Sequence, residues 1–214
     1  PENFFNDTFV LFMPRDIVSG DFYWMHDSGF KQYIAAVDCT GHGVPGAFMS
    51  IIGHNSLNKI VRESGITKPS DILDHLNIEV VHALLQRSEK AVRDGMDISV
   101  ISYDILEHTV DYAGAYQPLY HVREGKVTIY RGDRFPIGMI DGQARKSFTN
   151  HRVEVKPGGE HEKKFKTINI RSLLAEIHML PVEEQKFRLE KAIREWMGDL
   201  AQVDDILFIG TRVP

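Results

Sequence analysis

The order in which the hydrophobic period changes along the chain most constrains its fold. Period-two runs rich in aromatic and β-branched residues come first, a helical stretch follows, and strands, a second helical stretch and a final strand complete the sequence. The expected strands are residues 8–13, 16–25, 32–38, 96–103, 109–113, 119–123, 126–131, 146–155 and 206–213, and the expected helices are residues 47–63, one that opens at residues 67–71, 170–178 and 182–197. Strands in runs and helices in pairs predict an α+β fold of two packed sheets with helices outside, rather than an alternating parallel fold.

The apolar positions of the expected helices indicate how each one is buried. Residues 47–63 carry apolar side chains on more than one side, so this helix is expected to be largely buried. In residues 182–197 one face, which includes Leu189 and Trp196, is apolar and the opposite face is charged. The helix that opens at residues 67–71 has a single apolar stripe of Leu73, Leu76, Val80 and Leu84.

Length, charge and cysteine content exclude several classes of protein. A chain of 214 residues corresponds to one domain at about 100–200 residues per domain. A formal net charge of −5 argues against nucleic acid as a partner, because phosphate backbones attract basic surfaces. No apolar run reaches the about 18 residues of a membrane span, and a single cysteine, Cys39, excludes an intramolecular disulfide and fits a reducing compartment. Because the sequence does not begin with Met, we expect a piece of a longer or processed chain.

Acidic residues occur at three places beside apolar strands. Asp21 lies within one expected strand, Asp38 ends the next, and Asp204–Asp205 open the last. The short turn between the first two strands can bring Asp21 and Asp38 to the same sheet edge. Converging carboxylates repel one another, and a hard divalent ion such as Mg²⁺ or Mn²⁺ relieves that repulsion, because carboxylates and backbone carbonyls are its preferred ligands. The glycines that would let a carbonyl approach such an ion are Gly20, Gly41 and Gly43.

The same residues allow other interpretations. A single Asp at a strand end is typical of a turn or a helix cap, and residues 41–46 match the G-x-G-x-x-G dinucleotide pattern. A second helix follows, however, where a dinucleotide-binding unit needs a parallel strand. Cys39 is an unsupported nucleophile, because Pro45 stands where a thiolate phosphatase loop needs arginine. His42 either helps by donating a proton or only packs in its loop.

Six segments spread across nearly the whole chain are informative together, although each alone is weakly specific. They are PRDIVSGDFYW (residues 14–24), AAVDCTGHGVPGAFMS (35–50), DGMDIS (94–99), YAGAYQPLY (112–120), PIGM (136–139) and VDDILFIG (203–210). In these segments and in their order the chain resembles the SpoIIE-type, or RsbU-type, bacterial members of the PPM (type 2C) metal-dependent serine/threonine phosphatases.

The resemblance implies a four-layer α/β/β/α sandwich with two Mn²⁺ or Mg²⁺ ions at one end of the sheets. Asp21 and Asp38 would be metal ligands, the backbone carbonyl of Cys39 would replace a position that is often glycine, and Asp204 would be the C-terminal ligand with Asp205 beside it. The implied reaction is hydrolysis of a phosphoserine or phosphothreonine monoester by a water whose pKa the ions lower. No phosphoenzyme is then needed, which agrees with the missing nucleophile.

The chain departs from the family pattern near residues 158–160. After residues 153–158 the family continues with an apolar strand ending in Ser/Thr-Asp-Gly, whose aspartate binds metal, but here GEHEKKF follows directly. One interpretation is that a segment is missing from the printed sequence, and the alternative is a true deletion that removes a core strand and the activity. An intact mass equal to that of the 214 printed residues would exclude the missing segment.

The resemblance also implies a biological setting. The expected substrate is a phosphorylated STAS-type anti-anti-sigma factor, and the expected arrangement is a single phosphatase domain, residues 1–214, behind a sensor domain in a longer signalling protein. A homodimer is expected by analogy, and the location is the cytoplasm, with the parent protein either soluble or membrane-anchored. The alternative from another class is a catalytically inactive module that binds the phosphorylated partner or senses a signal.

Overall fold

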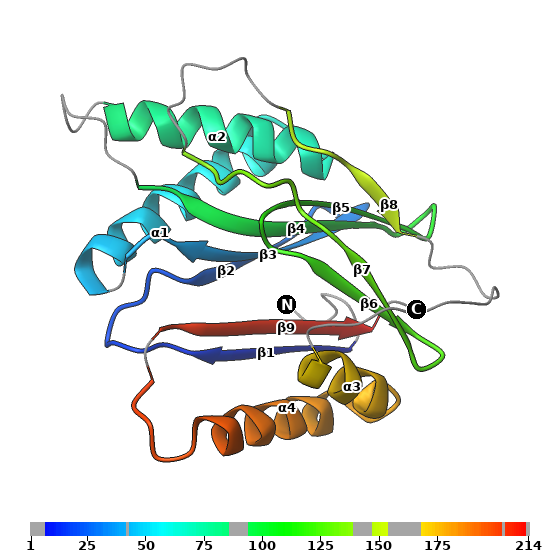
Figure 1. Ribbon diagram of the computed structural model, residues 1–214. Coiled ribbons are helices and arrows are strands. Elements are labelled where there is room, and N and C mark those ends of the chain that lie inside the picture. The colour runs from blue at the N-terminus through cyan, green and yellow to red at the C-terminus, as the bar shows by residue number, and fades with distance from the viewer. Residues whose placement is uncertain are drawn as a thin grey trace.

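The computed structural model describes residues 7–41, 43–85, 94–138, 147–153, 168–202 and 204–212 (Figure 1). Within these ranges the strands are β1 (Asp7–Met13), β2 (Phe22–Asp27), β3 (Lys31–Cys39), β4 (Met96–Asp104), β5 (Thr109–Ala115), β6 (Leu119–Arg123), β7 (Lys126–Tyr130), β8 (His151–Val153) and β9 (Ile206–Arg212). The helices are α1 (Gly43–Leu57), continued by the π-helical segment η1 (Asn58–Glu63), then α2 (Pro69–Leu85), α3 (Ile168–Ile177) and α4 (Val182–Met197). No described helix combines the length and the hydropathy that a membrane crossing requires.

The largest sheet has the strand order β2-β3-β4-β5-β8, and each neighbouring pair is antiparallel. Its central strands carry fully buried residues such as Val37 on β3 and Ile98 and Val100 on β4, because both faces of the sheet are covered. The loop after β3 enters α1, and α1 leads through η1 to another helix. The described residues therefore contain no parallel strand after α1, which contradicts the dinucleotide alternative.

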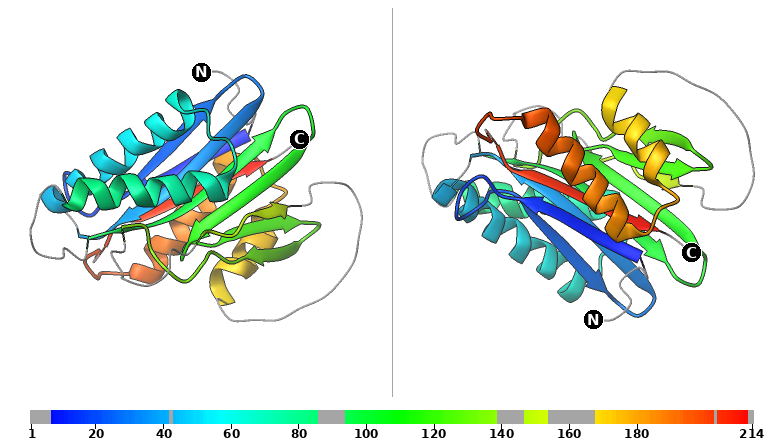
Figure 2. Two further views of the ribbon diagram at one scale, coloured as in Figure 1. Left: turned by 90° about the horizontal axis from the view of Figure 1, so that it is seen from above. Right: turned by 90° about the horizontal axis from the view of Figure 1, so that it is seen from below.

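The elements form four layers, as the resemblance implies. Helices α1 and α2 cover one face of the five-stranded sheet, strands β1, β9, β6 and β7 lie against its other face, and α3 and α4 form the outer layer below them (Figures 1 and 2). Three apolar clusters correspond to the three contacts between layers. The predicted α+β sandwich is confirmed.

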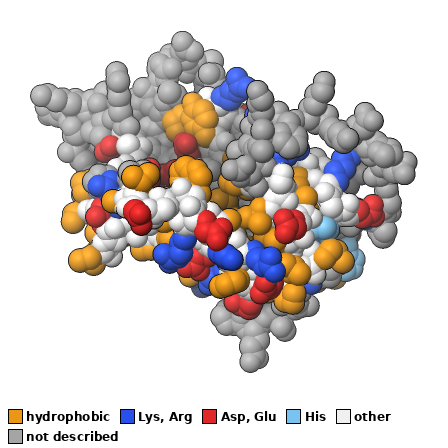
Figure 3. All heavy atoms as spheres, turned by 60° about the horizontal axis from the view of Figure 1, so that its bottom comes forward, with side chains coloured by type: hydrophobic (Ala, Val, Ile, Leu, Met, Phe, Trp, Pro, Cys, Tyr) orange, Lys and Arg blue, Asp and Glu red, His pale blue; other side chains and the backbone are white. Residues whose placement is uncertain are grey.

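The apolar faces predicted for α2 and α4 are buried to different extents. The stripe of α2 is buried as predicted: Leu73, Leu76 and Val80 have no exposed surface. On α4, Leu189 is buried and ion pairs join Arg188 to Glu184 and Arg194 to Glu190 on the solvent side, where charges of both signs are interspersed (Figure 3). Trp196 of the same predicted apolar face is 80% exposed, because it lies in the last turn of the helix.

The helix expected at residues 47–63 begins earlier, at Gly43, and is not largely buried. Val44 is 76% exposed and Ile51 is 57% exposed. This prediction was wrong because α1 belongs to an outer layer, so only its face with Met49 and Gly53 meets the sheet. Apolar composition on several sides of a helix does not by itself indicate burial on several sides.

The strand expected at residues 16–25 begins only at Phe22. Residues 14–21 form a loop, because their polar groups bond to a carboxylate instead of a neighbouring strand: the Arg15 amide and the Ser19 hydroxyl both donate to Asp205. The strand expected at residues 146–155 is described only as β8, and residues 146, 154 and 155 lie outside the described ranges.

The second β layer consists of two separate antiparallel pairs, β1-β9 and β6-β7. Ile209 of β9 and Leu119 and Tyr130 of the other pair pack on the same cluster of the large sheet. Within the described ranges no strand joins the two pairs.

Candidate functional site

The pairing of β2 with β3 brings the first two predicted acids together. Phe22 lies opposite Val37, so Asp21 and Asp38 are the next residues outward at the end of the sheet. The two side chains are close enough for the charge of Asp38 to act on Asp21. The antiparallel neighbours predicted from the short turn are confirmed.

A third acid, Asp97, stands directly opposite Asp38 in the register of β3 and β4. Burial, and then the charge of Asp38, raises the pKa of Asp97 to about 6. The sequence interpretation gave this residue no role, although the segment DGMDIS that contains it was part of the resemblance. Its alternation with the buried residues Met96 and Ile98 made it look like the solvated position of an ordinary strand.

The C-terminal acids reach the same place from the connection between α4 and β9. The connections after β1, β3 and α4 all lie at one end of the sheets, on the left of Figure 1. A cavity of about 280 Å³ at this end is lined by Asp21, Asp38, Cys39, Thr40, Gly41, Asp204 and Asp205. Acids from three distant stretches of sequence thus surround one space, as expected from the sequence.

Asp204 and Asp205 are adjacent but differ in what holds them. One oxygen of Asp205 accepts the Arg15 amide at 2.6 Å and the other accepts the Ser19 hydroxyl at 2.6 Å. Partial burial alone would raise the pKa of Asp205, but the hydrogen bonds, led by that of Ser19, lower it below its ordinary value. The Asp204 carboxylate accepts the Asp205 amide through Oδ1, at 2.9 Å. Asp205 therefore fixes the loop before β2, whereas Oδ2 of Asp204 accepts no hydrogen bond from the residues that the structure describes.

The glycines of the supporting loop are required by close backbone contacts. A Cβ atom on Gly20 would stand 2.5 Å from the Gly41 carbonyl oxygen and 3.2 Å from that of Cys39. Gly41 and Gly43 have φ values of +87° and +64°, a region that favours glycine. These three residues let the loops before β2 and after β3 meet beside the acids.

Burial and mutual repulsion dominate the electrostatics of the cavity. Burial, followed by the charges of Asp38, Asp205 and Asp204, raises the pKa of Asp21 to about 8. Partial loss of hydration and the Asp204 charge likewise raise the pKa of Asp38. Burial also raises the pKa of the Cys39 thiol, which is 4% exposed, so this group is a protonated thiol and a poor nucleophile.

The donor set suits a hard divalent cation by its chemistry. It consists of carboxylates with backbone carbonyls nearby, and burial together with the neighbouring negative charges raises the pKa of Asp21, an effect that a bound cation would offset. Within the described ranges no three Asp, Glu, His or Cys side chains already stand in ligating positions. Ion binding would therefore draw the carboxylates inward.

Two predictions lie outside the described residues. His42, the predicted helper, lies between described residues 41 and 43, and the departure near residues 158–160 lies within the gap between residues 153 and 168.

Comparison with known proteins gives a consistent result. The sequence profile of the family described as stage II sporulation protein E (SpoIIE) matches residues 28–214. The SiaA PP2C domain of Pseudomonas aeruginosa is 28% identical, with a TM-score of 0.82, and the match covers 96% of this chain and 85% of that one. A comparison with curated protein sequences found no match.

Two more distant structures show the same fold. The PP2C phosphatase domain of SpoIIE from Bacillus subtilis, solved with a fragment of its regulatory domain, is 20% identical with a TM-score of 0.70, over 95% of this chain and 60% of that one. RsbX in complex with magnesium is 14% identical with a TM-score of 0.60, over 94% of this chain and 92% of that one.

Proposed function

The chain belongs to the SpoIIE family of PP2C-type serine phosphatase domains, and on that premise we propose that it is a metal-dependent protein phosphatase that hydrolyses a phosphoserine monoester on a regulatory protein. The observation that carries this proposal is the convergence of Asp21, Asp38, Asp204 and Asp205 on one cavity. Like charges so arranged destabilise the metal-free fold, and a bound divalent cation would offset their repulsion.

The proposed ligands of two Mn²⁺ or Mg²⁺ ions are Asp21, Asp38, Asp204 and the backbone carbonyl of Cys39, with Asp205 beside them. When bound, the ions supply hydroxide near neutral pH and neutralise charge on the phosphoryl group. Asp205 positions the loop that carries Asp21, through its bonds to Arg15 and Ser19. The magnesium complex of RsbX supports the choice of a hard ion.

The remaining parts of the proposal rest on the family resemblance. We propose a phosphorylated STAS-type protein as substrate, a sensor domain in the same polypeptide, residues 1–214 as a single catalytic domain, and a homodimer as the assembly. The proposed location is the cytoplasm, whose reducing conditions suit the free thiol of Cys39.

A catalytically inactive module is the second candidate function. It is favoured by the departure from the family pattern near residues 158–160, and within the described ranges no three ligating side chains already stand in position for a metal ion. An intact mass above that of the 214 printed residues would show that the protein contains a further segment near residues 158–160. An equal mass would favour the inactive module.

Turnover with and without metal separates the two candidates. Wild-type protein should hydrolyse a phosphoserine peptide and a generic aryl phosphate with Mn²⁺ or Mg²⁺, and chelator and Asp38→Asn should each abolish this activity. A folded wild-type chain with no turnover on either substrate, with either ion, would contradict the phosphatase and support the binding module.

A further inference from the structure

Gln117 lies at the same end of the large sheet as the acids. The register of β3, β4 and β5 aligns Val37, Ile98 and Ala115 in one row across the three strands. Gln117 follows Ala115 by two residues. A second cavity of about 240 Å³ adjoins the acidic one. It is lined by Asp21, Ala36, Val37, Asp38, Gln117, Asp205, Ile206, Leu207 and Phe208. Gln117 is thus the uncharged polar side chain of a space shared with the acids.

The backbone turn that carries Gln117 is strained and firmly held. Tyr116 has a φ of +57°, which is uncommon for a residue with a bulky side chain. The Tyr116 amide donates to the Asp133 carbonyl at 2.9 Å, the Gln117 amide donates to the Ala115 carbonyl at 2.6 Å, and the Tyr112 hydroxyl donates to the Gln117 carbonyl at 2.6 Å. A strained residue persists only where its surroundings fix it, and such residues gather at binding sites.

Two glycines make this turn possible. A Cβ atom on Gly114 would stand 2.5 Å from the Gln117 carbonyl oxygen and would also overlap the Tyr112 hydroxyl. A Cβ atom on Gly132 would stand 2.8 Å from the Gly114 carbonyl oxygen, which accepts the Asp133 amide at 2.8 Å. The position of the Gln117 backbone is therefore fixed by packing on both sides.

The side chain of Gln117 has no such partner. Its carboxamide makes no hydrogen bond to any described residue, although its backbone N–H and C=O are both bonded. Gln117 is half-buried at the cavity, so a ligand that enters the cavity can reach the carboxamide. The firmly held backbone and the free carboxamide together indicate a group positioned for a ligand.

The chemistry of the cavity indicates which part of a ligand Gln117 contacts. A carboxamide donates and accepts, which matches the N–H and C=O of a peptide bond. It is neutral, so it adds no charge to offset a phosphoryl group. The start of β9 lines the same cavity, and because Phe208 packs toward α4 while Ile209 packs on the large sheet, Leu207 is the apolar side chain on the cavity side, suitable for a flanking residue of an extended segment.

We infer that Gln117 is a substrate-binding residue whose carboxamide contacts the main chain of the substrate next to its phosphoserine. This inference rests on the proposed phosphatase function and assigns the part of the site that distinguishes a phosphoprotein from a small phosphate ester. Tyr116 acts as a positioning residue, since its left-handed backbone sets the direction of the next residue.

Kinetics on two substrates test the inference. With Mn²⁺ present, Gln117→Leu should lower kcat/KM for a phosphoserine peptide about 10-fold, mostly through KM, because about one hydrogen bond is lost. Activity on an aryl phosphate, which has no peptide main chain, should stay within about 2-fold of wild type. Tyr116→Gly, which releases the backbone, should raise the peptide KM by a smaller factor. Gln185→Leu, at a glutamine bonded to the His178 and Leu180 carbonyls, is the matched control and should leave both substrates unaffected.

Each other outcome has a definite meaning. Equal losses on both substrates would show that Gln117 contacts the phosphoryl group, and no loss on either would show that it contacts no substrate; both overturn the inference and leave the phosphatase intact. If wild type turns over neither substrate, the phosphatase proposal fails. Fluorescence anisotropy with the same peptide then tests Gln117 alone: about 10-fold weaker binding to Gln117→Leu supports the inference, and equal binding overturns it.

Discussion

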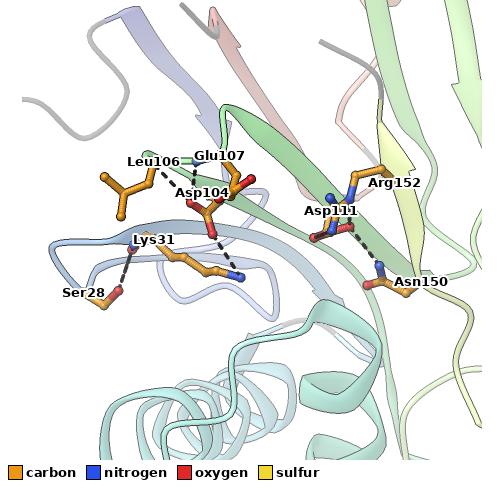
Figure 4. A network of polar contacts seen from close by, with 8 residues as sticks. All are labelled: Ser28, Lys31, Asp104, Leu106, Glu107, Asp111, Asn150 and Arg152. Atoms are coloured by element: carbon orange, nitrogen blue, oxygen red, sulfur yellow. Dashed lines mark hydrogen bonds and ion pairs between the residues drawn. The ribbon is translucent and has the colours of Figure 1, made fainter. Parts of the chain in front are cut away.

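The two ends of the β3-β4 strand pair treat acidic residues in opposite ways. At one end Lys31 faces Asp104, with 3.6 Å between Nζ and Oδ2, and the Leu106 and Glu107 amides also donate to Asp104 (Figure 4). At the other end Asp38 faces Asp97. Among the described residues no ion pair involves either of these two acids. The first end follows the rule that opposite charges stabilise cross-strand pairs, and the second breaks it.

The pKa values follow the same division. The backbone hydrogen bond from Glu107, together with other contacts, lowers the pKa of Asp104, whereas burial and like charges raise those of Asp97 and Asp38. On the neighbouring strand β5, Asp111 is 7% exposed and accepts hydrogen bonds from Arg152 and Asn150 (Figure 4). Asp104 and Asp111 have cationic or amide partners within the chain, whereas Asp38 and Asp97 face each other with raised pKa values, as expected of groups whose partner is a bound cation.

The largest expected effect is on activity. Asp38→Asn should lower metal-dependent turnover by more than the about 10–100-fold that loss of an outer partner of a metal site costs. Asp104→Asn makes the same chemical change at the opposite end and should leave turnover unchanged. Phosphoserine peptide assays on both folded variants measure this difference, and equal losses would remove the distinction between the two ends.

The next effect is on stability, at the end where acids have partners. Asp111→Ala should lower the free energy of unfolding by about 1–3 kcal/mol, because it leaves donors of Asn150 and Arg152 without their acceptor. In the metal-free protein Asp38→Asn should instead raise this free energy, since it removes a like charge. Urea unfolding in chelator measures both signs, and a loss of stability in both variants would contradict the comparison.

The metal-free protein should also lose stability as the pH rises. Asp21 has a pKa of about 8 in the fold, mainly through burial, against 3.8 for the ordinary group, so the folded state binds this proton more tightly. Its contribution is fully present below about pH 4 and is lost as the pH rises through about 8. Urea unfolding at several pH values should show this decline, and Asp21→Asn should flatten it. An unchanged slope in the variant would assign the dependence to another group.

The smallest effect is expected at the exposed ion pair. Lys31→Ala should change the free energy of unfolding by only about 0–1 kcal/mol, because water screens a pair at 3.6 Å whose side chains are partly exposed. Thermal unfolding at low and high salt measures it. If Lys31→Ala lowered the free energy of unfolding more than Asp111→Ala does, the partner of Asp104 would contribute more than those of Asp111, which would contradict this expectation.

Local patterns predicted the sheets, the helix pairs and the neighbouring positions of Asp21 and Asp38, whereas the four layers and the place of Asp204 followed from the family resemblance. Period-two strands and the turn before Lys31 set the β2-β3 register, and the register places Asp21 beside Asp38. Asp97 was missed because its role depends on which strand pairs with β3, and a single sequence does not state that pairing. The hydrogen bonds that hold Asp205 in place were also missed, since one of them comes from Ser19, which is 186 positions from Asp205 in the sequence.

The exposure of α1 and the late start of β2 were predicted wrongly for related reasons. Hydrophobic spacing shows which side chains are apolar, but Val44 and Ile51 are exposed because of the layer in which the helix lies. The loop before Phe22 contains β-branched residues that favour a strand, yet the Asp205 carboxylate holds its polar groups. In both cases a tertiary contact outweighs a local preference.

Anomalous scattering from Mn²⁺-soaked crystals tests the central claim most directly, because it locates the ions without reference to any family. The account predicts difference density among the carboxylates of Asp21, Asp38 and Asp204, near the Cys39 carbonyl, with the carboxylates drawn toward it. Ions found only elsewhere, with these side chains unmoved, would contradict it.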